Sequence, residues 1–228
     1  MTYTVVARCP RTKKLGVAMA TRAPAVGNRC PIVRPRMGAA SVQLIADPRQ
    51  TMLAGRLIDL GYSAPKILDE LKASDPHIRQ RQIGVVDSFG NTAAFSAPAD
   101  PGFSGHVEGE GWVAMGNAVV SGDVVEAMAE SMRTTAEDDF SDRLVAAIEA
   151  GTAAGGQREG QFSAAILVFG DEPFAEVDLR VDFHEGAVAE LRRIYDWYRP
   201  LFPYYIQRSY DPYIEREDRY RDAVLSAG

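Results

Sequence analysis

The chain has 228 residues, of which 46% are apolar and 25% charged, with a formal net charge of −6. This length suits one substantial hydrophobic core rather than two full domains. No apolar stretch approaches the roughly 20 residues that a membrane span needs, and residues 1–16 lack the basic start and apolar run of a signal peptide. We therefore expect a cytoplasmic protein without a membrane partner. An acidic charge with no basic block argues against nucleic acid as a partner.

The cysteines and histidines are few. Cys9 and Cys30 are the only cysteines, and two thiols in a chain of this length predict buried structural residues rather than a disulfide framework. None of the three histidines has a second ligand at the spacing of a zinc motif. We expect no metal and no cofactor.

In the first half of the chain, alternating and apolar stretches predict strands on either side of a helical pair. The strands are expected at residues 2–9, 15–20, 32–36, 38–46, 81–87 and 91–96. After Pro48 the apolar period changes to 3.6, which predicts a helix over 51–60 that ends at Gly61, and a second helix that begins at Ser63. This helical pair is expected to cover a sheet.

The second half of the chain repeats this order after a loop at 97–103. It is expected to hold a short strand at 111–115, helices at 121–132 and 140–150, strands at 162–169 and 176–182, and a helix at 186–198. Two strand-rich blocks, each followed by a helical pair, favour two sheets packed face to face and covered by helices. A doubly wound parallel sheet would instead alternate one strand with one helix. We therefore expect an α+β fold.

Nine segments of the chain together resemble the DUF1028 family. In chain order they read MTYTVVA, LGVAMAT, AVGNRCPIVR, GAASVQ with a following DPR, RQIGVVDSFGNTAAF, GHVEGEGWVAMGN, VVEAMAESM, AAGGQREGQFSAA and DLRVDFHEGAVAELRR. This family is similar in fold to the Ntn hydrolases, which use the residue at the processed N-terminus as nucleophile. The resemblance implies a four-layer αββα sandwich of the Ntn-hydrolase-like class over residues 1–193, followed by a C-terminal tail at 194–228.

Thr2 is the first candidate for catalysis. An N-terminal threonine can act as nucleophile and base together, because its own α-amine, with a pKa near 8, takes the hydroxyl proton. The amine becomes free only when Met1 is removed, which a small second residue permits. The structural alternative is that Thr2 simply begins a strand, where threonine is common. If Thr2 is catalytic, it should lie in the main cleft.

Two further residues are candidates for catalysis. Ntn hydrolases with a threonine nucleophile often place a cation near the depth of Arg34, so the resemblance implies a role for Arg34 or its neighbour Arg36. Either arginine could instead lie solvated at a strand edge. Asn117 follows Gly116 in an expected strand-to-helix turn, where backbone N–H groups and the Asn117 side chain could stabilise an oxyanion. Asn117 could equally cap the following helix.

Several polar residues are candidates for substrate binding. Thr21 and Arg22 end an expected strand, where side chains can face a cleft. Gln43 lies in a small, apolar strand, so its amide needs partners, which a substrate or the protein backbone would supply. Within residues 155–163, glycines allow close backbone approach, and three side chains could bind substrate. These three are Arg158, Gln161 and Ser163. Arg180 shares a polar strand face with three neighbours, as a binding residue or in a structural ion pair.

Three functions follow from these residues. The first is an Ntn-type hydrolase of a small non-peptide or cyclic amide that uses Thr2. The second is a protein of the same fold whose cleft binds a small molecule or a partner without catalysis. The third is an enzyme that uses the cleft arginines and Gln43 for other chemistry. A fold alone does not decide among them.

The tail at 194–228 is expected to be an assembly surface that makes the protein a homodimer or a larger homo-oligomer. Tyrosine, tryptophan and arginine are enriched at protein–protein hot spots. The aromatic residues here are Tyr195, Trp197, Tyr198, Phe202, Tyr204, Tyr205, Tyr210, Tyr213 and Tyr220. Three prolines should prevent one continuous helix, so the segment must pack on something to be ordered. A tail that wraps its own domain is the alternative.

Overall fold

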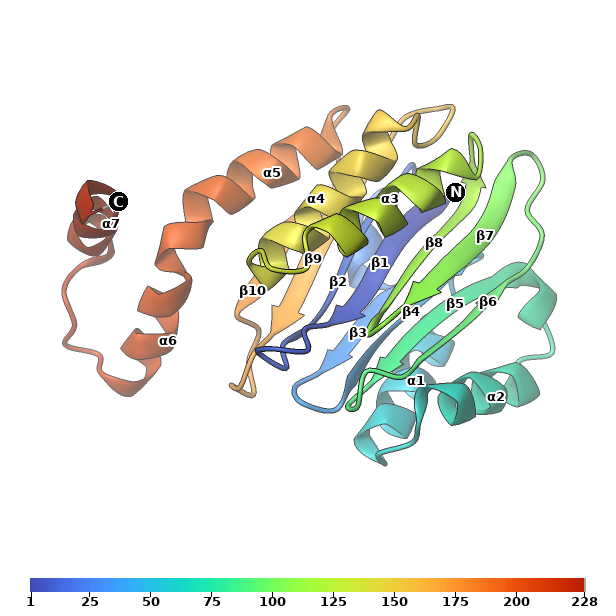
Figure 1. Ribbon diagram of the computed structural model, residues 1–228, viewed down its shortest axis with the longest axis horizontal. Helices are drawn as coiled ribbons and strands as arrows, with labels where there is room; N and C mark the ends of the chain where they lie inside the picture. The colour runs from blue at the N-terminus through green and yellow to red at the C-terminus, as the bar shows by residue number, and fades with distance from the viewer. Residues whose placement is uncertain (228) are drawn as a thin grey trace.

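The computed structural model describes residues 1–227, which form two antiparallel sheets covered by helices (Figure 1). The larger sheet has the strand order β10-β9-β2-β1-β8-β7. Its strands are β1 (Thr2–Arg8), β2 (Leu15–Thr21), β7 (Phe103–Gly109), β8 (Trp112–Val119), β9 (Ser163–Phe169) and β10 (Val177–Val181). The smaller sheet has the order β3-β4-β5-β6. Its strands are β3 (Pro31–Arg34), β4 (Gly38–Leu44), β5 (Arg81–Asp87) and β6 (Thr92–Ser96).

The helices lie on the outer faces of the two sheets. The helices α3 (Asp123–Thr134), α4 (Phe140–Ala153) and α5 (Ala187–Tyr198) pack on the larger sheet, whereas α1 (Pro48–Asp59) and α2 (Ala64–Ser74) pack on the smaller one (Figure 1). No helix among residues 1–227 has the length and apolar character to cross a membrane. Aspartate side chains cap the start of α1 and α4: the Asp47 carboxylate accepts from the Arg49 N–H, and the Asp139 carboxylate accepts from the first backbone N–H groups of α4.

The core is divided into three layers by the alternation of side chains along each strand. On β1, Val6 faces the space between the sheets, where Met19 and Met115 also pack. Tyr3 and Val5 face the opposite way, against α3 and α4. Because burial of a large apolar side chain stabilises a fold by roughly 1.5–3 kcal/mol, these layers hold the sheets together.

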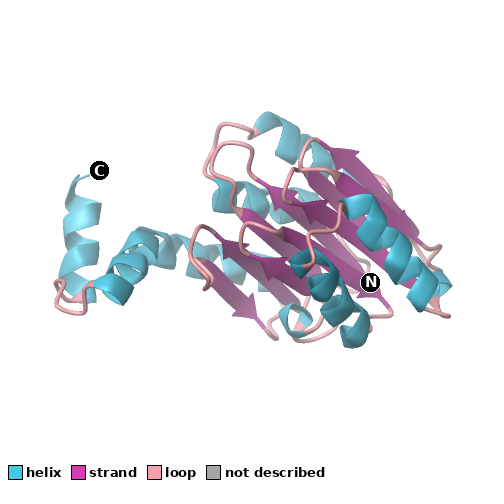
Figure 2. Cartoon of the chain, turned by 90° about the horizontal axis from the view of Figure 1, so that it is seen from below, coloured by secondary structure: helices cyan, strands magenta, loops and turns pink. Residues whose placement is uncertain are grey.

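The remaining chain forms α6 (Phe202–Tyr210) and α7 (Glu217–Ala227), which extend beyond the sheets (Figures 1 and 2). The boundary expected at 193/194 falls inside α5, which runs from Ala187 to Tyr198. Beyond this boundary, Tyr195 is fully buried in the main core, and Phe202 joins the same core cluster. The compact body therefore continues past that boundary before the chain leaves it.

The mixed α/β fold expected from the sequence is confirmed, with two local differences. Residues 103–109 form β7, which the sequence analysis missed because its polar and glycine-rich pattern resembles a loop. The strand expected at 111–115 extends to Val119, so Gly116 and Asn117 lie inside β8 rather than in a turn. Pairing with β1 and β7 on either side outweighs the turn preference of a Gly-Asn pair.

Candidate functional site

A row of polar side chains crosses the inner face of the larger sheet at one end. The strand register pairs Thr2 with Thr21 on one side and with Asn117 on the other. Thr21 in turn pairs with Ser163, and Asn117 with Ser104. Directly paired residues point to the same face of a sheet. The next row along β1 begins with Met19 and Met115 beside Thr4, so the polar row marks the end of the apolar core.

Thr2 and Thr21 form the centre of this row. Their hydroxyl oxygens are 3.0 Å apart, and Thr2 is 5% exposed. The Thr21 hydroxyl also donates to the backbone carbonyl of Met1. Since a hydroxyl carries one hydrogen, that bond leaves the Thr2 hydroxyl as the donor between the two threonines. The Thr2 oxygen therefore keeps its acceptor positions free.

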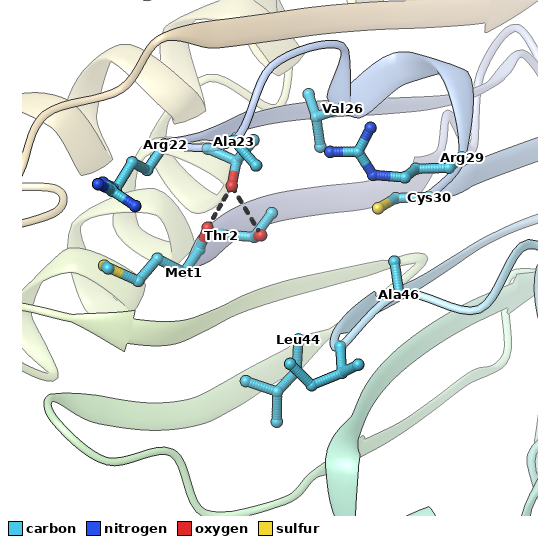
Figure 3. Close-up of a pocket in the computed structure, with 11 residues that line it drawn as sticks. Met1, Thr2, Arg22, Ala23, Val26, Arg29, Cys30, Leu44 and Ala46 are labelled. Atoms are coloured by element: carbon cyan, nitrogen blue, oxygen red, sulfur yellow. Dashed lines mark hydrogen bonds between the residues drawn. The ribbon is translucent and has the colours of Figure 1, made fainter.

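Thr2 opens into a cavity of about 300 Å³ between the ends of the two sheets (Figure 3). The larger sheet contributes the N-terminus and the end of β2, and the smaller sheet contributes the end of β4. The cavity is lined by Met1, Thr2, Thr21, Arg22, Ala23, Val26, Arg29, Cys30, Leu44, Ile45 and Ala46. It therefore combines a hydroxyl pair, two cations and an apolar wall, and none of its lining residues is acidic.

The segment 155–163 passes the N-terminal end of β1. On one side the Gly156 carbonyl accepts from the Val120 N–H at 3.0 Å, just beyond β8, and on the other the Phe162 N–H donates to the Thr21 carbonyl at 2.9 Å. Because β1 lies between β2 and β8, the segment crosses from one flank of Thr2 to the other. Gly155 and Gly156 have φ of 108° and 51°, which glycine adopts without strain.

A chain of buried amides lies beside this row, between the sheets. Gln43 Oε1 accepts from the Thr4 hydroxyl at 2.6 Å, and Gln43 Nε2 donates to Gln82 Oε1 at 2.8 Å. Asn117 Nδ2 donates to the same oxygen at 2.9 Å. Gln82 Nε2 donates to the carbonyls of Gly105 and Gly116, which can only accept, so the orientation of the Gln82 amide is fixed.

Among residues 1–227, two buried amides keep unpaired polar atoms. The Oδ1 of Asn117, a residue with no exposed surface, has no hydrogen-bond partner. Both side-chain polar atoms of Gln157, in the segment that passes β1, are also unpaired, and this residue is 4% exposed. Leaving such an atom unpaired costs about 1–3 kcal/mol.

The environment also shifts the ionisation of two cavity groups. Burial lowers the pKa of the Met1 α-amine below its usual value, and Arg22 acts in the same direction while Cys30 opposes it. Burial raises the pKa of the Cys30 thiol to about 11, although Arg29 opposes that rise. Cys30 is therefore a neutral thiol at neutral pH, and the charge of the cavity comes from its arginines and the terminal amine.

The structure separates the expected site residues into two groups. Thr2, Thr21 and Arg22 line the cavity, and Arg22 forms an ion pair with Glu159 of the segment at 155–163. Ser163 does not line the cavity but fixes the backbone of two residues that do. Its hydroxyl donates to the Ala23 carbonyl at 2.7 Å and accepts from the Val26 N–H.

Other expected residues lie elsewhere. Arg34 Nε binds Asp59 Oδ2 of α1 at 3.0 Å, and Arg36 pairs with Asp171, so neither arginine lines the Thr2 cavity. A charged residue at a strand end pairs with the nearest carboxylate, which the sequence does not identify. Arg180 pairs with Asp182 and lines a different, smaller cavity.

The remaining three expected binding residues do not line the cavity either. Arg158 is exposed, and Gln161 lies over Gly156. Gln43 finds its partners in the side chains of Thr4, Ser41 and Gln82 rather than in substrate or backbone.

Three parts of the cavity are not predicted by any sequence pattern: Arg29, Cys30 and the wall formed by residues 44–46. Arg29 lies in a loop after the short helical turn Val26–Asn28, and no periodic pattern marks it. Leu44 has a φ of 79°, an uncommon conformation for a bulky residue that often accompanies a binding site. Among residues 1–227, no group of three or more His, Cys, Asp or Glu side chains could hold a metal ion.

Fold and site together define a two-sheet α+β protein whose first strand begins with a threonine in a cavity. The model of a family of unknown function, DUF1028, matches residues 2–191, and the chain belongs to this family. The crystal structure of protein SPO2555 from Silicibacter pomeroyi, described with the same family model, is similar with a TM-score of 0.78 and 26% identity. That similarity covers 86% of this chain and 88% of SPO2555.

A more distant similarity links the chain to Anbu, an ancestral beta-subunit, from Yersinia bercovieri. The TM-score is 0.44 and the identity 11%, over 90% of this chain and 97% of the Anbu chain. No curated protein matches the chain.

Proposed function

We propose that the protein is a small Ntn-type amidohydrolase that cleaves the C–N bond of a non-peptide or cyclic amide, with Thr2 as nucleophile. The proposal includes a fold of the four-layer αββα, Ntn-hydrolase-like class, which the helices on both outer sheet faces support. The observation that carries it is the position of Thr2. Its hydroxyl is buried against Thr21 and opens into a cavity at the start of a central strand.

In the proposed reaction, removal of Met1 exposes the α-amine of Thr2 next to its own hydroxyl. The amine takes the hydroxyl proton while Thr2 Oγ1 forms a bond to the amide carbonyl carbon. The C–N bond then breaks, and the proton passes from the amine to the leaving nitrogen. Water adds to the resulting ester in the same way, which releases the acid and restores the threonine.

Removal of Met1 would also change the hydrogen bonds around Thr2. The Thr21 hydroxyl loses its acceptor, the Met1 carbonyl, and becomes free to donate to Thr2 Oγ1. Asn117 Nδ2 donates one of its two N–H groups to Gln82 Oε1, whereas its Oδ1 is an acceptor without a partner among residues 1–227. We assign Asn117 to hold the Thr2 amine rather than an oxyanion, the role expected from the sequence.

The alternative function is a binding protein that retains Met1 and has no nucleophile. The observation that favours it is that Met1 is well held, with its amine partly buried and its carbonyl bonded to Thr21. Intact mass of the protein from cells, combined with a screen of small amides, separates the two functions. We expect Met1 to be absent, Thr2→Ala to abolish turnover with the fold retained, and Thr2→Ser to keep part of it. Full activity in protein that retains Met1 would exclude the terminal-amine mechanism.

We further propose that the tail joins two copies of the chain. The rings of Tyr198, Tyr204, Tyr205 and Tyr220 pack on one another, so α6, α7 and the C-terminal end of α5 form one aromatic unit. This unit projects from the body instead of wrapping it (Figures 1 and 2). Trp197 is 53% exposed and Tyr213 93% exposed, which leaves aromatic surface for a partner.

A further inference from the structure

The charge of the Thr2 cavity is unbalanced. Two arginines line it, and none of its lining residues is acidic. Arg22 is neutralised by Glu159, whose carboxylate binds its Nε. Within residues 1–227, no Asp or Glu forms an ion pair with Arg29, and its guanidinium donates to backbone carbonyls. Arg29 is therefore the arginine of the cavity whose charge no acidic side chain compensates.

The guanidinium of Arg29 is held by the backbone and keeps unused N–H donors. Its two terminal nitrogens donate to the carbonyls of Ala25 at 3.1 Å and Pro24 at 2.8 Å. A guanidinium carries five N–H donors, so these two bonds leave three for a ligand. The backbone of Arg29 is fixed as well, because its carbonyl accepts from the Thr51 hydroxyl at 3.0 Å. A guanidinium fixed in this way loses little conformational entropy when it binds an anion.

The apolar wall on the smaller sheet is equally fixed. The Ile45 N–H donates to the Gln80 carbonyl at 3.1 Å, and the Ile45 carbonyl accepts from Arg81. Arg81 is itself buried and paired with Asp75 at 2.7 Å. These bonds hold Ile45 with 58% of its surface exposed beside the cavity (Figure 3 shows Leu44 and Ala46 of the same wall). A short carbon chain in the cavity would contact this wall.

We propose that the substrate is a small amide that also carries a carboxylate, bound as an ion pair by Arg29 with its carbon chain against residues 44–46. The reaction at the amide rests on the function proposed above, whereas the binding of the carboxylate does not. A carboxylate matches the planar fork of an arginine. An arginine without a carboxylate partner and an adjoining apolar wall fit a carboxylate on a short carbon chain better than a fully hydrated phosphate.

Isothermal titration calorimetry on the full chain with Thr2→Ala, which blocks turnover, tests the binding. The probes are succinamate and levulinamide, which have the same length and amide but differ in having a carboxylate or a methyl ketone. We expect succinamate to bind at least tenfold more tightly, with an advantage that shrinks as salt rises. Added Arg29→Gln should reduce the difference to within twofold. Arg36→Gln, a change at an exposed arginine paired with Asp171, should leave it intact.

Two results would overturn the proposal: equal affinities for the two probes, or a preference for succinamate that survives Arg29→Gln. Inorganic phosphate that binds Arg29 more tightly than succinamate at the same ionic strength would also overturn it. If Arg29→Gln does not fold, Arg29→Lys replaces it, and the preference should fall to an intermediate value because the fork is lost but the charge stays. Selective binding without turnover by the wild-type protein would contradict only the proposed function. Equal turnover of both probes would contradict only the substrate class.

Discussion

The hydroxyl oxygens of Thr2 and Thr21 lie 3.0 Å apart on paired strands, and the Thr21 hydroxyl also bonds the carbonyl of Met1. This arrangement couples the state of the N-terminus to the nucleophile. While Met1 is present, the Thr21 proton points to the Met1 carbonyl. Once Met1 is removed, the same proton can be donated to Thr2, where it would orient the hydroxyl for attack.

Thr21→Val tests this coupling, because valine keeps the shape of threonine without its hydroxyl. We expect kcat for an amide substrate to fall by about 10- to 100-fold with little change in KM, since the lost contact orients the nucleophile. The free energy of unfolding should fall by only about 1 kcal/mol, the usual contribution of one hydrogen bond. Thr21→Ser restores the hydroxyl and should recover most of the rate. A Thr21→Val protein with wild-type kcat would show that Thr21 has no part in the reaction.

The proposed role of Asn117 predicts a change in pH dependence. An acceptor beside the charged Thr2 amine stabilises its protonated form, so loss of that acceptor should lower the pKa of the amine. The neutral amine is the base in the reaction, and the acid limb of the kcat–pH profile should therefore move to lower pH in Asn117→Ala. A purely structural loss would reduce kcat at every pH and leave the limb in place, which makes the profile the deciding measurement.

The sequence predicted the strands and helices that carry the site better than the site itself. Thr2 was identified from the chemistry of an N-terminal threonine and from the resemblance to DUF1028. Thr21 and Arg22 were identified because strand ends can be located from apolar alternation, and strand ends border clefts. Gln43 was recognised as a buried amide in need of partners. Its actual partner Gln82 lies on β5, and no local pattern reveals a contact between two residues separated by a helical pair.

The sequence did not predict which arginine, Arg34 or Arg29, lies in the cavity. Both are arginines near strand β3, and the sequence does not distinguish them. The difference between them arises from contacts that form only in the folded chain. Asp59 of α1 lies beside Arg34 and neutralises it, whereas Arg29 lines a cavity without acidic lining residues. Asn117 was misplaced for a related reason, because cross-strand pairing to Thr2 extends β8 through a pair of residues that usually form turns.

Asp87 connects the smaller sheet to its helices, and it predicts an acid-dependent loss of stability. Its carboxylate accepts from the N–H groups of Ala64, Phe89 and Asn91 and from the Asn91 side chain, at 2.9–3.0 Å. Burial alone would raise the pKa of Asp87, but these bonds outweigh it and hold the pKa below its usual value. The stabilisation is therefore complete at neutral pH and is lost as the pH falls below about 4 through the lowered pKa.

We expect Asp87→Asn to lower the free energy of unfolding by about 2 kcal/mol at pH 7, because an amide cannot accept all four bonds. The difference from wild type should shrink as the pH approaches 3. Urea unfolding at several pH values measures it. Asp69→Asn, at an exposed position on the neighbouring α2, is the matched control and should change stability by less than about 0.5 kcal/mol. A pH-independent difference between Asp87→Asn and wild type would contradict the assigned cause.

The tail predicts a change in oligomeric state on truncation, and the structure determines where to cut. A chain ended after Asp196 would lose Leu201 and Phe202, both of which are buried, so it would test folding rather than assembly. A chain ended after Asp211 keeps α6 and removes α7 with the exposed Tyr213 and Leu225. We expect light scattering to give a dimer or larger closed assembly for the full chain and a smaller species for the truncated one.

Truncation removes both the aromatic and apolar contact surface and a whole segment of the chain. A full-length variant that carries Tyr213→Ser and Leu225→Ser removes the contact surface alone. Both side chains are mostly exposed in the single chain, at 93% and 60%, so their replacement should leave the free energy of unfolding of an isolated chain nearly unchanged. If the tail is the interface, burial of these side chains holds the copies together, and the variant should dissociate at concentrations where the wild type does not. A full chain that is monomeric at micromolar concentration would refute the proposal. A truncated chain that keeps the oligomeric state of the full chain would place the interface elsewhere.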